Sequence, residues 1–216
     1  MLAEKYRPKD FSEVIGQSKI VKTLQWTLNQ SNPIGPVVLL SGPSGSGKTT
    51  LAYCAARYWG CSEWDIRKIE SAEADISALR EISQNMWLCG AGHRGRKCYI
   101  IDEIHTITGR AQDRLLSLFE ELRPHCLLVG TTTESEWAGP TLFSRFTRLS
   151  LAKPSSAEVS AYIETIAQKE GLPIPTDTRW AEKMVKYNGL NIRDLLNQLP
   201  SRLFDLEPEA AEICAA

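Results

Sequence analysis

Short apolar runs alternate along the chain with segments whose apolar residues recur every three or four positions. Five segments have the length and patterning of strands: 37–40, 64–70, 98–102, 126–132 and 145–151. Three segments between them have helical spacing: 49–59, 75–88 and 110–122. This alternating order predicts an α/β fold with a parallel five-stranded sheet and helices on both faces.

The pattern changes after Pro154, where only helical spacing remains. Residues 155–171 begin at serines that can cap a helix and end at Gly171, and two further helices are expected at about 177–188 and 191–205. We therefore expect two domains and a tail. The boundaries are 1–152 for the α/β domain, 153–206 for a small all-helical lid domain and 207–216 for the tail.

A glycine-rich loop, Gly42-x-x-x-x-Gly47-Lys48-Thr49, joins the first predicted strand to the first predicted helix. Its glycines let successive backbone N–H groups point into one concavity, and the following helix adds the positive end of its dipole. The spacing is that of a phosphate-binding loop, in which Lys48 reaches the β- and γ-phosphates and the Thr49 hydroxyl binds Mg²⁺. The sequence therefore predicts a nucleotide site.

Composition narrows the class of protein. With 216 residues, of which 43% are hydrophobic, the chain can form substantial cores, and its net charge of −1 leaves any nucleic-acid contact to a local patch. Six cysteines include no C-x-x-C pair, and Cys89, His93 and Cys98 are too few and too irregularly spaced for zinc. The sequence shows no signal peptide and no apolar run of membrane length, so we expect reduced thiols and no membrane. The expected location is the cytoplasm for a bacterial or viral protein, and the nucleus for a eukaryotic one.

Two acids follow the predicted strand at 98–102. Asp102 and Glu103 fall at its carboxyl end, where open α/β sheets bind ligands. We expect Asp102 to hold Mg²⁺ and Glu103 to polarise the attacking water, since phosphoryl transfer needs a metal and an oriented nucleophile. The run "GTTTES" (130–135) ends the neighbouring strand with hydroxyl residues that can position the same water.

The order of these motifs resembles that of the AAA+ ATPases, and within them the clamp-loader subunits. The resemblance covers about residues 3–200 and includes "EKYRPKDFSEVIGQ" (4–17), the phosphate loop, "IIDEIH", "GTTTES", "FSRF" and "NIRDLLN". The opening segment is similar to that of replication factor C small subunits and of the bacterial tau/gamma subunit. The resemblance implies ATP and Mg²⁺ as cofactors.

The resemblance also implies a set of site residues. Thr132 falls at the position called sensor 1, Arg145 at an arginine finger that acts on a neighbour's nucleotide, and Arg193 at sensor 2 on the lid. The adenine pocket would be lined by Ala3, Arg7, Val14 and Ile15. The phosphates would be bound by Gly42, Pro43, Ser44, Gly45, Ser46, Gly47, Lys48, Thr49 and Thr50, together with Arg193.

Two features depart from the family's pattern. "SRF" replaces "SRC", which keeps the arginine and loses the cysteine, and the zinc cysteines of tau/gamma are absent. The sequence also stops just past the expected lid, whereas clamp-loader subunits continue into a helical collar. Either a longer chain has been cut here, or the chain is a minimal ATPase that assembles without a collar.

Three functions remain open from the sequence. The first is a clamp-loader-like ATPase that works in an oligomer with similar subunits, a sliding clamp and primed DNA. The second is a DNA motor such as a Holliday-junction branch-migration ATPase, and the third is a nucleotide-binding scaffold. For the first, a DNA-binding stripe is expected from four basic residues: Arg80, Lys97, Arg110 and Arg114.

Overall fold

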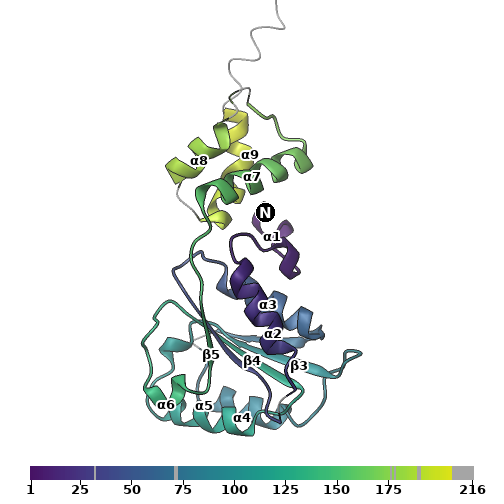
Figure 1. The fold of residues 1–216 in the computed structure, drawn as a ribbon, viewed down its shortest axis with the longest axis vertical. Helices are drawn as coiled ribbons and strands as arrows, with labels where there is room; N and C mark the ends of the chain where they lie inside the picture. The colour runs from purple at the N-terminus through teal and green to yellow at the C-terminus, as the bar shows by residue number, and fades with distance from the viewer. Residues whose placement is uncertain (32, 71–72, 176, 178, 189–190, 206–216) are drawn as a thin grey trace, which may run out of the picture. The chain divides into compact units, whose positions relative to one another are not determined.

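A computed structural model describes residues 1–31, 33–70, 73–175, 177, 179–188 and 191–205 (Figure 1). The chain divides into two compact units. The α/β unit, Pro8–Ala152, contains five strands and most of the helices. The strands are β1 (Val37–Ser41), β2 (Cys61–Ile69), β3 (Arg96–Ile101), β4 (Cys126–Thr132) and β5 (Thr147–Ser150). The helices are α2 (Ser18–Leu28), α3 (Lys48–Trp59), α4 (Ile76–Asn85), α5 (Arg110–Glu121) and α6 (Pro140–Phe143), with single turns η1 (Phe11–Glu13) and η3 (Ile104–Thr106).

The five strands form one parallel sheet in the order β2-β3-β4-β1-β5. The first strand, β1, lies inside the sheet next to β5; the chain then crosses to the far side at β2 and returns through β3 and β4, which is the central strand. All strands end at the same edge, so the loops after β1, β3 and β4 lie next to one another. The predicted parallel five-stranded sheet is confirmed.

Alternate residues of the buried strands face two separate hydrophobic cores. Val37 and Leu39 of β1 pack on the side of α4, α5 and α6, whereas Val38 and Leu40 pack on the side of α2 and α3. Figure 1 shows the two helical layers on opposite faces of the sheet. Helices on both faces explain why these strands are continuous apolar runs in the sequence.

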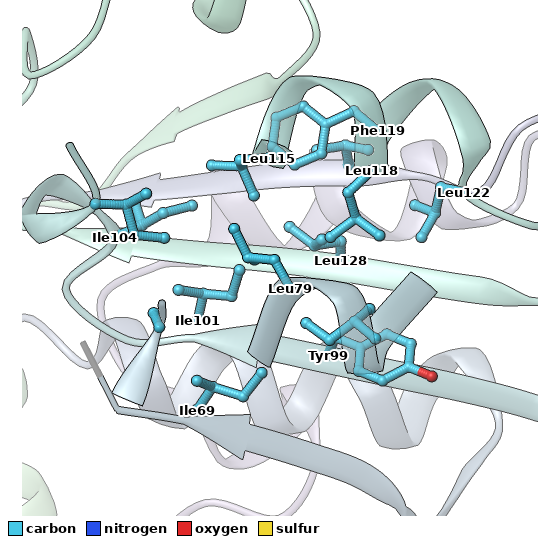
Figure 2. Close-up of a cluster of buried hydrophobic side chains, with 14 of the residues drawn as sticks. Ile69, Leu79, Tyr99, Ile101, Ile104, Leu115, Leu118, Phe119, Leu122 and Leu128 are labelled. Atoms are coloured by element: carbon cyan, nitrogen blue, oxygen red, sulfur yellow. The ribbon is translucent and has the colours of Figure 1, made fainter. Parts of the chain in front are cut away.

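The core beneath α4 and α5 fixes the strand that carries the acidic pair. Figure 2 shows Leu79 of α4 and Leu115 and Leu118 of α5 gathered in one cluster with Ile101 of β3 and Leu128 of β4. All five side chains are fully buried. Because this packing surrounds the carboxyl end of β3, the position of the next residues in the chain is well defined.

The second unit, here called the helical unit, combines Met1–Arg7 with the chain from Lys153 onward. Its helices are α1 (Leu2–Lys5), α7 (Ser156–Glu170), α8 (Trp180–Asn188) and α9 (Ile192–Asp205). Helix α7 begins with a capping box between Ser155 and Glu158 and ends at Gly171, as its sequence predicts. None of the described helices is long and apolar enough to cross a membrane.

The first seven residues belong to a different unit from the one expected, since the expected boundaries placed 1–152 in one domain. In the structure they group with the helical unit, because Lys5 Nζ donates to Glu170 Oε1 (2.5 Å), Tyr6 donates to the same oxygen, and Tyr162 donates to the Tyr6 carbonyl (2.7 Å). The other division falls between Ala152 and Lys153, where the sequence also placed a boundary. The expected tail, 207–216, lies outside the described residues.

Candidate functional site: a phosphate loop beside an acidic strand end

The glycine-rich loop runs from the end of β1 to the start of α3. Gly42 has φ +152°, and a Cβ there would lie 2.5 Å from the Leu151 carbonyl oxygen. Gly47 has φ +90° and caps α3, whose first helical bond runs from the Leu51 N–H to the Gly47 carbonyl (2.8 Å). Four residues lie between these glycines, and the three that carry an N–H, Ser44, Gly45 and Ser46, lead into the positive end of the helix, where an anion is favoured.

Lys48 is buried inside this loop, with 6% of its surface exposed. Its ammonium donates to the carbonyls of Gly42 (2.9 Å) and Pro43 (3.1 Å). Burial lowers the pKa of Lys48, and the nearby carboxylates of Asp102 and Glu103 oppose that shift. The side chain is thus a cation held in the concavity of the loop, as the sequence predicts for a group that meets phosphate.

Thr49 and Asp102 meet beside the loop. Thr49 Oγ1 lies 3.1 Å from Asp102 Oδ1, although Thr49 belongs to the first turn of α3 and Asp102 follows β3. The second carboxylate oxygen, Oδ2, accepts from Lys68 Nζ of β2 at 2.9 Å, and Thr131 of β4 donates to Oδ1. Three strands and one helix therefore converge on this carboxylate.

Asp102 is ionised in this setting. Burial would raise its pKa, but hydrogen bonds from Thr131, Lys68 and Thr49 and the charge of Lys68 more than offset that effect, so the pKa is lowered. A carboxylate and a hydroxyl, both oxygen donors, suit a small hard cation such as Mg²⁺. Next to a loop that favours phosphate, the residues present fit a magnesium-bound nucleotide.

Glu103 adopts a backbone conformation that is rare for a residue with a side chain. Its φ is +50°, in the left-handed region, and its N–H donates to Thr131 Oγ1 (3.2 Å). Its carboxylate oxygen Oε2 accepts from the Thr133 hydroxyl (3.3 Å) and lies 3.3 Å from His105 Nδ1. Strained backbone of this kind is kept where surrounding structure holds it, often at functional sites.

The two buried threonines at the end of β4 have different partners. Thr131 contacts both acids, whereas Thr132 Oγ1 lies 3.1 Å from His105 Nδ1 and accepts from the Glu134 N–H (3.0 Å). The sequence singled out Thr132 and missed Thr131. Consecutive strand residues point to opposite faces, so a run of three threonines does not reveal which one meets the carboxylate.

Arg145 lies at the other edge of the sheet from the phosphate loop. It lies two residues before β5, whose first residue, Thr147, pairs with Val38 near the start of the parallel strand β1. The loop that holds Lys48 follows the opposite end of β1. Arg145 Nη2 is bonded to Glu120 Oε1 at the end of α5 (2.8 Å), and about half of its side chain is exposed. Within its own α/β unit, Arg145 is thus remote from the glycine-rich loop that holds Lys48.

The remaining predicted nucleotide contacts are divided between the units. Val14 follows η1 and packs against the core on the α2 and α3 side of the sheet, and Ile15 is partly buried. In the helical unit, Ala3 and Arg7 lie in and after α1, and Arg193 lies in the first turn of α9. The roles of these five residues at the nucleotide stay predictions.

Of the four predicted DNA contacts, two are exposed and two bond to other elements of the fold. Arg80 on α4 and Arg110 at the start of α5 are exposed on neighbouring helices. Arg114 donates to Ser83 of α4 and lies 3.7 Å from Glu121, and Lys97 donates to the Asn85 carbonyl (2.9 Å). Lys97 is near the start of β3, away from the end of the strand that leads to Arg110. Lys97 and Arg114 therefore join elements of the fold.

Lys68 is a second site residue, besides Thr131, that the sequence analysis missed. Its segment was identified as a strand, but a lysine between charged neighbours is usually solvated. The available signal was its position near the carboxyl end of a strand, one residue from the buried Ile69. That signal becomes informative only when the strand order puts β2 beside β3.

Comparisons with known proteins agree with this architecture. The model of the ATPase family associated with various cellular activities (AAA) matches residues 38–153, more than half of the chain. A DNA polymerase III subunit gamma/tau from Mycoplasma genitalium is 30% identical over 81% of this chain and 32% of that protein. A DNA polymerase III subunit gamma from Buchnera aphidicola is 29% identical over 92% of this chain and 60% of that protein. The chain thus spans from about a third to three fifths of these relatives' length.

Solved structures give a second line of similarity. The Holliday junction branch migration motor RuvB of Thermotoga maritima superposes with a TM-score of 0.71 at 27% identity, over 90% of this chain and 64% of that one. Its A156S mutant gives a TM-score of 0.74 at 27% identity over 94% and 66%. The family match runs from β1 to the junction between the two units and includes both the phosphate loop and the acidic pair. The chain belongs to the AAA family of ATPases.

Proposed function

We propose that the α/β unit binds ATP with Mg²⁺ and hydrolyses it. The observation that supports this best is the meeting of Thr49 with Asp102 at the edge of a loop that holds Lys48. Lys48 would contact the β- and γ-phosphates, while Thr49 and Asp102 would hold the metal. Bound there, Mg²⁺ would neutralise charge that develops on the transferring phosphoryl group.

Glu103 is proposed to orient the attacking water. Its contacts with Thr133 and His105 hold the carboxylate at the same edge of the sheet as the phosphate loop. Thr132 is proposed to assist at the γ-phosphate, and Arg193 to act on the nucleotide bound by its own chain. These roles follow from the resemblance to AAA+ ATPases and await test.

We further propose that the chain works in an oligomer that loads a sliding clamp on primed DNA in the cytoplasm. The support is the similarity to gamma and tau subunits of DNA polymerase III and the opening segment "EKYRP". The structural similarity to RuvB favours a second candidate, a motor that moves branched DNA. A nucleotide-binding scaffold without turnover is the third possibility.

Hydrolysis is tested by comparing the wild type with Glu103→Gln. We expect both to bind ATP and only the wild type to release phosphate, because the substitution removes the base and keeps the shape of the side chain. Equal turnover in the two proteins would contradict the role of Glu103. Binding without turnover in the wild type, even in assembled form, would favour the scaffold.

The choice of DNA task is tested by stimulation of ATP turnover. Primed single-stranded DNA with a sliding clamp is compared with a four-way junction at equal nucleotide concentration. Stimulation by the primed DNA and clamp supports clamp loading, whereas stimulation by the junction alone supports branch migration.

A further inference from the structure

Lys68 lies on the same face of the sheet as the phosphate-loop helix. In β2 it pairs with Ile100 of β3, and side chains of paired residues in parallel strands point to the same face. Ile100 belongs to the core shared with α3, so the Lys68 stem lies on the α3 side near the end of the strand. This position directs its ammonium to the place where Thr49 meets Asp102.

The ammonium of Lys68 bridges two carboxylates. Its Nζ lies 2.9 Å from Asp102 Oδ2 and 2.5 Å from Glu70 Oε1. The two acids differ in exposure, because 14% of the Asp102 side chain is accessible to solvent against 61% for Glu70. Lys68 thus has one partner inside the site and one partner at its rim.

The ammonium of Lys68 would compete with a metal ion for the carboxylate of Asp102. Mg²⁺ takes its ligands in a tight octahedral arrangement and carries two positive charges. A unit charge about 3–4 Å from another interacts strongly even at the effective dielectric of a protein surface. The ammonium and the metal therefore oppose each other at Asp102, whereas Glu70 can still accept the lysine when it leaves.

We propose that Lys68 is a positioning residue that occupies the carboxylate of Asp102 in the metal-free state and is displaced toward Glu70 when Mg²⁺ binds. A poorly exposed carboxylate that lacks a neighbouring cation lowers the stability of the fold, so Lys68 stabilises the folded chain when no metal is bound. The same contact weakens the affinity of the site for Mg²⁺. This inference rests on the proposed function, because Asp102 is taken to hold the metal that accompanies the nucleotide.

The variant that tests this is Lys68→Met, which removes the ammonium and keeps most of the stem. Lys68→Arg retains the charge, and Lys22→Met removes a charge from the exposed surface of α2 as a matched control. Binding of a fluorescent ADP analogue is titrated with MgCl₂ for all four proteins. Thermal unfolding is then measured without nucleotide, in excess MgCl₂ and in NaCl of equal ionic strength.

We expect the Mg²⁺ midpoint of Lys68→Met to fall about ten-fold. One adjacent charge shifts the pKa of a carboxylate by about 1–3 units, and a ten-fold change in affinity corresponds to the smaller end of that range. Lys68→Arg and Lys22→Met should keep the wild-type midpoint. Without nucleotide, Lys68→Met should unfold at a lower temperature than the wild type, and MgCl₂ should raise its unfolding temperature by more.

An unchanged or higher Mg²⁺ midpoint in Lys68→Met would overturn the inference. If the wild type binds no nucleotide at any Mg²⁺ concentration, the proposed function fails, and the unfolding data then decide the question for Lys68. A larger Mg²⁺ shift in Lys68→Met than in the wild type would support competition, whereas equal shifts would overturn it.

Discussion

Thr49 Oγ1 and Asp102 Oδ1 lie 3.1 Å apart although 53 positions of sequence separate them. The contact exists because β1 and β3 flank β4 in a parallel sheet, so the residues that follow each strand meet at one edge. One residue comes from the phosphate loop and the other from the acidic strand end. Their contact brings two separate sequence motifs together at the proposed metal and nucleotide site.

Removing the Thr49 hydroxyl should weaken metal binding more than it weakens the fold. In Thr49→Val the hydrogen bond to Asp102 is lost, at a cost of about 1 kcal/mol of unfolding free energy, and the Mg²⁺ midpoint for nucleotide binding should rise. Thr27→Val is the control, because the Thr27 hydroxyl is buried without a hydrogen-bond partner. That control should keep the midpoint and the stability. Urea unfolding and Mg²⁺ titration check both, and an unchanged midpoint in Thr49→Val would argue against a metal at this hydroxyl.

The buried ammonium of Lys48 should leave a signature in the pH dependence of stability. Because burial lowers its pKa below the ordinary 10.5, the unfolded chain binds more protons than the folded chain between the lowered pKa and 10.5. Stability of the wild type should therefore rise through that window relative to Lys48→Met. Urea unfolding from neutral pH upward, without nucleotide, measures the difference. A difference that stays constant with pH would contradict the burial cost assigned to Lys48.

The glycines of the phosphate loop should differ in what they tolerate. In Gly47→Ala the added Cβ meets no other atom, so only the strain of positive φ lowers the free energy of unfolding, by about 1–2 kcal/mol. In Gly42→Ala the added Cβ also clashes with the Leu151 carbonyl, and the loss of stability should be larger. Gly139→Ala, with φ −70° and open space, is the control and should be close to neutral. Denaturant midpoints give the ranking, and a Gly42 variant as stable as the Gly139 variant would refute it.

Much of the sheet could be predicted because its strands are buried on both faces. β4 begins and ends at the predicted residues, Cys126 and Thr132, since a continuous apolar run has clear limits. β2 begins at Cys61 instead of 64, because an irregularity between Cys61 and Ile66 breaks the alternation. Helix α2 was not predicted, although Val21, Leu24 and Leu28 recur at helical spacing.

The chemistry of the site was predictable only where a motif is local. The residues of the loop around Lys48 follow one another in the sequence, and so do Asp102 and Glu103. Each motif can therefore be recognised from its own short segment. The contacts of Thr131 and Lys68 with Asp102 depend on strand order and on which face each residue occupies. Neither can be read from a single segment of sequence.

Arg145 should act on a neighbouring subunit's nucleotide, because it lies at the opposite edge of the sheet from its own phosphate loop. The Arg145→Ala monomer should bind nucleotide normally, but its turnover should no longer rise with protein concentration. In the assembled state its turnover should be about 10³ to 10⁵ lower than that of the wild type, because the arginine would neutralise charge in the transition state. Arg148→Ala, in the adjoining strand, is the matched control and should keep that rise.

Mixing two inactive variants tests the same assignment. Arg145→Ala supplies an intact Glu103, and Glu103→Gln supplies an intact Arg145, so a mixed assembly contains complete sites. Recovered turnover supports action in trans. No recovery, under conditions in which wild-type chains assemble and turn over, would show that Arg145 does not complete a neighbour's site.

The most direct test of the account is calorimetric titration of Mg²⁺-ATP into the Glu103→Gln chain with and without Lys48→Ala. Loss of one charge-assisted hydrogen bond, about 1.5–3 kcal/mol, predicts roughly 10- to 150-fold weaker binding. Arg57→Ala, in the last turn of the same helix and paired with Glu63, should leave the affinity unchanged. If the Lys48 variant binds as tightly as its parent, the loop at the end of β1 is not the nucleotide site.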